Sequence, residues 1–224
     1  MRRGDGLFTT KDGTLVAVSG IGFAAAAAAA TALVDAGAVA LVSWGVAGGL
    51  DPALRAGTIC LPGEVVSRDG TTFMTDHHWR ELIAAAIASR HTLVAGKLLT
   101  SNLAIDDDVG KANAFRDTGA VAVDMESAAV ASIAAARGLP FVAVRVIADT
   151  AVDALPRAVI EATRLGSVRI ARLLLETVRR PGDVAGLIRL AQRYRTARRV
   201  LAAVAHTGVL APFAMASSSP TRVA

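Results

Sequence analysis

Two acidic residues separated by one methionine, Asp124-Met125-Glu126, stand where an apolar run gives way to small helix-forming residues. If this segment is extended, the two carboxylates lie on one side of the chain and Met125 on the other. Carboxylate oxygens accept hydrogen bonds from pairs of hydroxyl groups, which makes a sugar diol a natural partner for Glu126. In the alternative, a helix begins here, Asp124 is its N-cap and Glu126 interacts with its positive end.

A third acidic residue, Asp149, ends the mostly apolar run PFVAVRVIA. At the rim of a sheet, partial burial would raise the pKa of this carboxyl and let it act as a general acid. The alternative is a turn or capping aspartate. For Arg145, within the same run, we expect a structural ion pair rather than a catalytic role.

Two glycine-rich segments could bring the backbone close to a ligand. Gly45-Val-Ala-Gly-Gly49 holds three glycines in five residues, which indicates close approach of a bound molecule. Gly20-Ile-Gly22 could offer backbone N–H groups to an anion at a helix N-terminus, and its alternative is a tight strand-to-helix turn. The histidines lack metal-ligand spacing, so we expect no metal site.

Alternating strands and helices must position these residues. We expect buried strands over residues 14–19, 39–43 and 140–147, and further strands over 58–61, 64–67, 92–99 and 121–123. Helices are expected up to residue 35, over 76–89, 111–118 and 126–137, and over most of the chain to 205. This order predicts an α/β fold with a largely parallel sheet covered on both faces. Ligands bind at the carboxyl ends of such strands, where the three loops 45–49, 124–126 and 148–150 are expected.

Composition indicates one globular domain in a reducing compartment. The 224 residues are 53 % hydrophobic and 4 % aromatic, enough for one sizeable core. The single cysteine, Cys60, excludes a disulfide scaffold and is expected as a small buried apolar residue. The N-terminus lacks the pattern of a secretory signal, and Asp35 and glycines interrupt the apolar stretch 20–50. We therefore expect a cytoplasmic protein.

The net charge of +5 is unevenly distributed along the chain. Residues 1–156 hold 12 basic and 16 acidic residues, whereas residues 157–200 hold 11 arginines and 3 acids. The acidic body and the single aromatic of the basic segment argue against nucleic-acid binding. Apolar residues recur at helical spacing between the arginines, at Leu187, Leu190, Tyr194, Ala197, Val200 and Leu201. This pattern predicts a basic amphipathic helix over 183–205 that contacts an anionic membrane. The alternative is a helix packed on the body or on a neighbouring subunit.

Three motifs resemble one known superfamily. Gly45-Val-Ala-Gly-Gly-Leu-Asp-Pro-Ala-Leu-Arg-Ala-Gly57, Val123-Asp-Met-Glu-Ser127 and Arg145-Val-Ile-Ala-Asp149 resemble the nucleoside phosphorylase and nucleosidase superfamily in order and spacing, from about Leu15 to Asp153. The resemblance implies a three-layer α/β/α fold with a mostly parallel, partly barrel-like sheet. It implies cleavage of the N-glycosidic bond of a purine nucleoside, with phosphate or water as nucleophile. No cofactor is implied, and inorganic phosphate would be the co-substrate.

The same resemblance implies a role for each site residue. Glu126 would bind the ribose hydroxyls, Met125 would form the ribose wall, and Asp124 would lie near base or ribose. Asp149 would protonate or hydrogen-bond purine N7, because adenine leaves poorly unless N7 is protonated, and nearby anions would stabilise the cationic ribosyl group. The wall around ribose and nucleophile would comprise Val46, Ala47 and Gly48, and the strip along the base would include Leu103 and Ile105. The resemblance identifies no side chain for phosphate, so Gly20 and Gly22 are the candidates from the glycine pattern alone. Ala148 and Val46 stand where many relatives have serine.

The C-terminal part resembles that of bacterial hopanoid-associated phosphorylases. This implies phosphorolysis of adenosylhopane, a lipid-linked adenine nucleoside, by a homo-oligomer peripheral to the inner face of the membrane. We expect a catalytic domain over 1–180, the basic helix over 181–205 and a disordered tail over 206–224. The alternatives are a methylthioadenosine/S-adenosylhomocysteine nucleosidase and a catalytically impaired purine- or lipid-binding homologue. The second alternative arises because relatives usually have one strand before the expected strand near Leu15.

Overall fold

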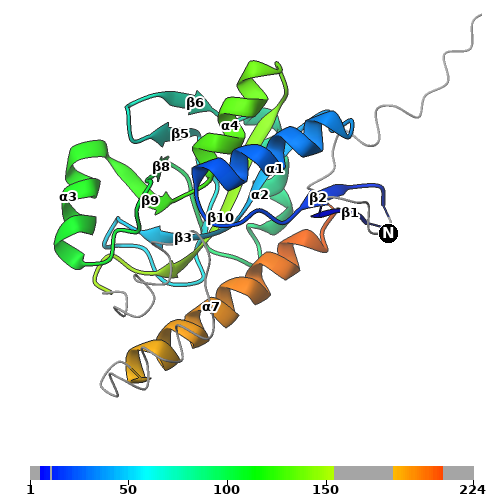
Figure 1. The fold of residues 1–224 in the computed structure, drawn as a ribbon. Helices are drawn as coiled ribbons and strands as arrows, with labels where there is room; N and C mark the ends of the chain where they lie inside the picture. The colour runs from blue at the N-terminus through cyan, green and yellow to red at the C-terminus, as the bar shows by residue number, and fades with distance from the viewer. Residues whose placement is uncertain (1–5, 11, 154–183, 209–224) are drawn as a thin grey trace, which may run out of the picture.

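An eight-stranded mixed sheet forms the centre of the molecule (Figure 1). The computed structural model describes residues 6–10, 12–153 and 184–208. Across the sheet the strand order is β6-β5-β8-β9-β3-β10-β4-β7. The strands are β3 (Leu41–Gly49), β4 (Ile59–Cys60), β5 (Glu64–Ser67), β6 (Thr72–Met74), β7 (Leu93–Val94), β8 (Lys97–Thr100), β9 (Ala120–Asp124) and β10 (Phe141–Asp149). The predicted strand 121–123 lies within β9, and β6 was not predicted.

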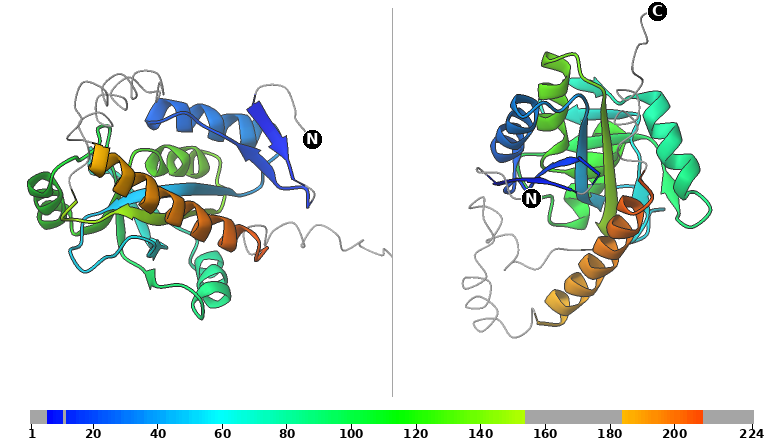
Figure 2. Two further views of the ribbon diagram at one scale, coloured as in Figure 1. Left: turned by 90° about the horizontal axis from the view of Figure 1, so that it is seen from below. Right: turned by 90° about the vertical axis from the view of Figure 1, so that its right-hand side faces the viewer.

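Helices cover both faces of this sheet (Figure 2). Helices α1 (Phe23–Asp35) and α4 (Ser127–Ala136) pack on one face through small side chains such as Ala30, Ala128 and Ala131. On the other face lie α2 (His77–Ile87) and α7 (Val184–Ala205). Helix α3 (Asp108–Thr118) packs beside β9. The predicted three-layer α/β/α fold is therefore confirmed.

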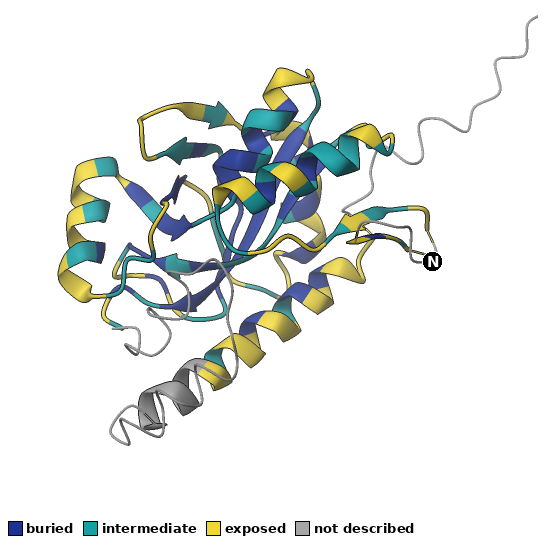
Figure 3. Cartoon of the chain, in the orientation of Figure 1, coloured by how far each residue is buried: buried dark blue, intermediate teal, exposed yellow. Residues whose placement is uncertain are grey.

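Strand β10 is the most deeply placed element of the sheet. All nine of its residues are buried, between β3 on one side and β4 on the other (Figure 3). A strand covered on both faces is expected to be apolar almost throughout, and Arg145 and Asp149 are its two charged exceptions. Buried charges require partners, so the contacts of these two side chains decide how the site is built.

The apolar run over residues 14–19 is not a buried strand of the main sheet. Its central part forms β2 (Leu15–Ala17), which pairs antiparallel with β1 (Leu7–Thr9) in a separate two-stranded sheet. The side of β2 that carries Val16 is partly open, and Val18 is 78 % exposed. A short apolar run fits both a central strand and a hairpin, because its periodicity does not distinguish them.

The predicted strand 92–99 divides into two strands with different neighbours. Strand β7 lies at the sheet edge beside β4, whereas β8 lies between β5 and β9. Gly96 separates them with a φ of +127°, a conformation that other residues rarely adopt. The chain bends here, and the neighbouring segment between β4 and β5 bends with it, because the N–H of Gly63 donates to the carbonyl of Gly96. The uninterrupted apolar pattern did not indicate this bend.

Helix α7 packs on the sheet through its apolar face. Ala197, Leu201 and Val204 are buried against β10 and its neighbours. The alternative predicted from the sequence, a helix packed on the body, is therefore found for the side chains described in this helix. None of the described helices combines the length and apolar character required to cross a membrane. The predicted boundary at 180/181 and the tail beyond 208 lie outside the described residues.

The predicted glycine loop 45–49 is the second half of strand β3. Gly45 pairs with Arg145 in the register of β3 and β10. A Cβ atom on Gly45 would lie 2.4 Å from Nη1 of Arg145, so the missing side chain makes room for the guanidinium group. Gly48 likewise lies against the carboxylate of Asp149, where a Cβ would be 3.1 Å from Oδ2. These glycines permit close approach of protein side chains.

Replacing Gly45 by alanine should lower the free energy of unfolding by about 1–3 kcal/mol, the usual cost of overpacking a core. Arg145 is buried and held by several partners, so it has no free space to move into. Chemical denaturation of the purified variant measures the effect.

Gly63→Ala is the matched control. Its Cβ would lie 2.5 Å from Nη1 of Arg80, but Arg80 is partly exposed and can swing toward solvent. An equal loss of stability in both variants would contradict the argument that the buried guanidinium makes the difference.

Candidate active site

The two predicted acidic positions meet at the end of strand β3. Strand β9 ends at Asp124 and β10 ends at Asp149. Gly48 of β3 pairs with Val123 on one side and with Asp149 on the other. Three strand ends therefore converge on one corner of the sheet, the region where ligands bind in α/β folds.

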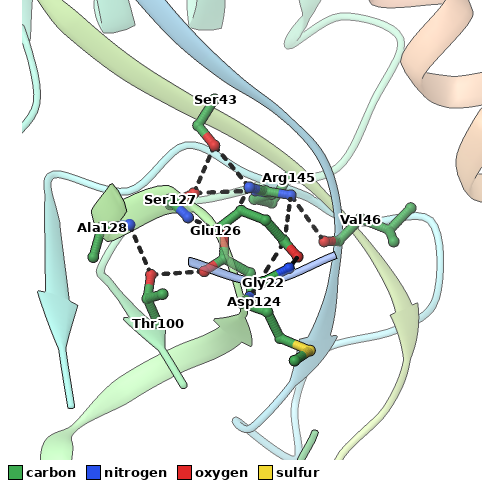
Figure 4. A network of polar contacts seen from close by, with 10 residues as sticks. Gly22, Ser43, Val46, Thr100, Asp124, Glu126, Ser127, Ala128 and Arg145 are labelled. Atoms are coloured by element: carbon green, nitrogen blue, oxygen red, sulfur yellow. Dashed lines mark hydrogen bonds and ion pairs between the residues drawn. The ribbon is translucent and has the colours of Figure 1, made fainter. Parts of the chain in front are cut away.

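Arg145 connects the carboxylates of this corner (Figure 4). Its Nη2 atom lies 2.7 Å from Oδ2 of Asp124, and its Nη1 atom lies 3.7 Å from Oε2 of Glu126. The guanidinium group also donates hydrogen bonds to the hydroxyls of Ser43 and Ser127 and to the carbonyl of Val46. The planar guanidinium group has five N–H donors, so it can bind several acceptors at once. The expected structural role of Arg145 agrees with this geometry.

Asp124 is enclosed by protein groups. Besides Arg145, its carboxylate accepts hydrogen bonds from the hydroxyl of Thr100 at 2.7 Å and from the backbone N–H of Ser127 at 3.0 Å. Ser127 is the first residue of α4, so Asp124 stabilises the start of that helix, although the N-cap position is Glu126 and not Asp124 as the capping interpretation predicted. Its side chain is fully buried. This geometry favours a structural role for Asp124 over direct contact with a ligand.

Glu126 has a more open environment. Its side chain is 21 % exposed, and its Oε1 atom accepts a hydrogen bond from the N–H of Gly22 at 3.0 Å. Gly22 is the N-cap of α1. The helix terminus that the sequence predicted as an anion site therefore faces a carboxylate of the protein itself, which the positive end of the helix favours. Gly20 of the same segment is exposed.

Asp149 forms an ion pair with Lys111 of α3. The Lys111 side chain is fully buried, and its ammonium group donates to Oδ2 of Asp149. Burial raises the pKa of Asp149, because a carboxylate loses hydration there, and Lys111 acts in the opposite direction. The direction of this shift agrees with the predicted partial burial of a general acid.

Lys111 also fixes the backbone that follows β10. Its ammonium group donates to the carbonyls of Thr150 and Asp153, each at 2.8 Å. With Asp149, these acceptors use all three donors of the lysine. The sequence did not indicate this contact, because Lys111 closely follows the aspartates 106–108, and such a charged run is typical of an exposed surface. Only the packing of α3 reveals its role.

The other predicted site residues lie in varied surroundings. Ala47 is buried in the core, Val46 packs partly against the α7 face, and Met125 is half-buried. Ile105 packs beside α3, whereas Leu103 is 58 % exposed.

Neither a metal cluster nor a reactive thiol contributes to this corner in the described residues. Within the described part of the chain, no three His, Cys, Asp or Glu side chains gather to hold a metal ion. Cys60 is buried, as predicted, and burial raises the pKa of its thiol to about 12. A thiol with that pKa is a poor nucleophile at neutral pH.

Several solved structures are similar to this fold. A putative methylthioadenosine nucleosidase from Weissella paramesenteroides is 25 % identical, with a TM-score of 0.59 over 72 % of this chain and 78 % of that one. The 5′-methylthioadenosine/S-adenosylhomocysteine nucleosidase of Neisseria meningitidis, in complex with methylthio-immucillin-A, is 21 % identical, with a TM-score of 0.66 over 88 % and 80 %. Futalosine hydrolase of Helicobacter pylori is 21 % identical, with a TM-score of 0.60 over 72 % and 79 %.

A family model matches the sequence itself. The model described as the phosphorylase superfamily matches residues 6–179. This range contains the three motifs and every predicted site residue. The match covers well over half of the chain and agrees with the three-layer fold, so the protein belongs to the phosphorylase superfamily.

Proposed function

We propose that this protein cleaves the N-glycosidic bond of an adenine nucleoside, with Asp149 as general acid and Glu126 as ribose ligand. The observation that carries the proposal is the contrast between two carboxyl groups beside the end of β3. Glu126 is partly open and faces one cation, Arg145, and one N–H group, whereas Asp149 is buried and its pKa is raised. Such a divergence of environments is typical of sites that separate acidic from anionic roles.

Each group then has a defined step. Protonated Asp149 donates its proton to N7 of the purine as the C–N bond breaks, so that adenine leaves as a neutral base. The carboxylate that remains on Asp149 is stabilised by the ammonium group of Lys111. Glu126 binds the ribose hydroxyls, and its negative charge stabilises the ribosyl cation. Arg145 and Gly22 hold Glu126 in place.

For the nucleophile and substrate, we propose phosphorolysis of adenosylhopane, which would leave a phosphorylated ribosyl hopane. The resemblance of the C-terminal segment supports this choice. Hydrolysis, as in a methylthioadenosine/S-adenosylhomocysteine nucleosidase, is the second candidate. It is favoured by the contact of Gly22 with Glu126, because a predicted phosphate donor already has an acceptor. The names of the similar structures, which are nucleosidases and a hydrolase, support it as well.

Peripheral contact with an anionic membrane remains a prediction for the C-terminal helix. The apolar side chains Ala197, Leu201 and Val204 already pack on the body. The exposed arginines Arg195 and Arg199 would therefore provide a mainly electrostatic contact.

Release of adenine from adenosylhopane and from methylthioadenosine, each with and without phosphate, tests the proposal. Phosphate-dependent release from adenosylhopane alone is the expected result. Phosphate-independent release from methylthioadenosine would instead establish the nucleosidase. Binding of adenine without release from either nucleoside would contradict catalysis and indicate a ligand-binding homologue.

Replacing Asp149 by asparagine should reduce turnover by about 10²- to 10⁴-fold, the usual contribution of a general acid. Nucleoside binding should change far less, because the amide keeps the size of the carboxyl group. Steady-state kinetics and calorimetric titration measure the two effects. Asp117→Asn, at an exposed aspartate of α3, is the control. Unchanged turnover of Asp149→Asn would remove Asp149 as the acid.

Replacing Glu126 by glutamine should weaken nucleoside binding by about 10- to 100-fold, which corresponds to the loss of one hydrogen bond to a charged group. Binding of free adenine should be unchanged, because adenine has no ribose. Titration of the variant with both ligands makes the comparison. An equal loss for adenine and nucleoside would contradict a ribose-specific role.

A further inference from the structure

A second polar network lies directly behind Asp149. Asp153 stands four residues after the acid, and its Oδ2 atom accepts hydrogen bonds from the backbone N–H of Thr150 at 2.9 Å and from the Thr150 hydroxyl at 2.6 Å. The same atom lies 2.5 Å from Nη1 of Arg193. Arg193 belongs to α7, far along the chain from the acid.

This network and the Lys111 network hold the same short segment. Lys111 binds the carbonyls of Thr150 and Asp153 from the α3 side, while Arg193 binds the carboxylate of Asp153 from the α7 side. Burial opposes ionisation of Asp153, yet hydrogen bonds from Arg193 and Thr150 lower its pKa to about 2. Asp153 is therefore a carboxylate at neutral pH and remains an acceptor for Arg193 and Thr150.

Packing gives α7 a defined position from which to act. Ala197, one helical turn beyond Arg193, is fully buried, and Leu201 and Val204 continue the same contact. The Arg193 side chain is 34 % exposed and that of Asp153 is 20 % exposed. The ion pair is thus partly shielded and is anchored by a packed helix, conditions under which an ion pair orients its partners better than at an open surface.

We propose that Arg193 is a positioning residue for Asp149: by binding Asp153, it couples the docking of α7 to the geometry of the catalytic acid. This inference rests on the proposed function, in which Asp149 donates the proton. Without Arg193, the turn after β10 would be held from the α3 side alone, and the carboxyl group of Asp149 would be placed less precisely against the leaving base. Small misplacements of this kind lower turnover strongly.

The charged groups around Asp149 determine how its titration should respond. They are Lys111 from α3, Asp153 from the following turn and Arg193 from α7. Arg193 lowers the pKa of Asp149 and Asp153 raises it. Removing the cation should therefore raise the pKa of Asp149 further. A general acid is active when protonated, so the alkaline limb of the pH–rate profile should move to higher pH.

Arg193→Gln tests the proposal in the full-length protein. We expect kcat for adenine release to fall by about 10- to 100-fold, with the alkaline limb shifted to higher pH. Arg193→Lys keeps the charge and should recover part of kcat. Arg198→Gln removes an exposed arginine of the same helix and is the matched control, expected to behave as the wild type. Circular dichroism establishes that each variant is folded.

A second readout does not depend on turnover. Carbon-13 NMR titration follows the carboxyl group of Asp149, which is identified by comparison with Asp149→Asn. Its pKa should rise in Arg193→Gln and stay unchanged in Arg198→Gln. If the wild type releases no adenine, the proposed function fails, and this titration alone tests whether Arg193 acts on Asp149.

Three results would overturn the inference. Wild-type kcat and an unchanged Asp149 titration in Arg193→Gln would show that the ion pair has no influence on the acid. In an active enzyme, a fall in kcat without a change in the Asp149 titration would show that the effect on turnover does not pass through Asp149. A changed titration with wild-type kcat would show that Arg193 does not position the acid for catalysis. An equal effect in Arg198→Gln would assign it to the general charge of the helix.

Discussion

The buried ion pair between Arg145 and Asp124 is the contact on which the corner of the sheet depends. Arg145 lies in the most deeply buried strand, and its guanidinium group reaches Asp124 at the end of β9, across β3. Because Gly45 has no side chain, β3 and β10 can pair closely around that group. Loss of one partner of such a pair typically costs about 3–5 kcal/mol, since the other charge remains buried. The pair therefore defines where β9 ends and where α4 begins.

This arrangement gives Asp124 and Glu126 different roles, one structural and one suited to ligand binding. Asp124, Ser43, Ser127 and Thr100 satisfy one another and Arg145, which makes a closed polar network. Glu126 is attached to that network at its open side and faces the N-terminus of α1. A rigid network behind a partly open carboxylate is what precise ligand placement requires, because the ligand-binding group is oriented before the ligand arrives.

Asp149 lies in a different electrostatic environment. Its environment combines burial, which favours the protonated acid, with one buried ammonium group, which favours the carboxylate. A group that exchanges a proton benefits from both influences, because neither state is stabilised so strongly that transfer stops. The groups that surround the acid come from α3, from the turn after β10 and from α7, so three distant parts of the chain contribute to one carboxyl group.

The alternation of strands and helices, the acidic residues at the ends of β9 and β10, and the superfamily were all predictable from the sequence. They depend on local periodicity and on motifs of adjacent residues. The folded structure was needed to reveal that Gly45 accommodates Arg145, that Gly22 binds Glu126, and that Lys111 and Arg193 lie around the acid. It also revealed that residues 15–17 pair in a hairpin and that residues 93–100 form two strands. These features are contacts between residues far apart in the chain. A single sequence carries no signal for them, because the way the elements pack determines which residues meet.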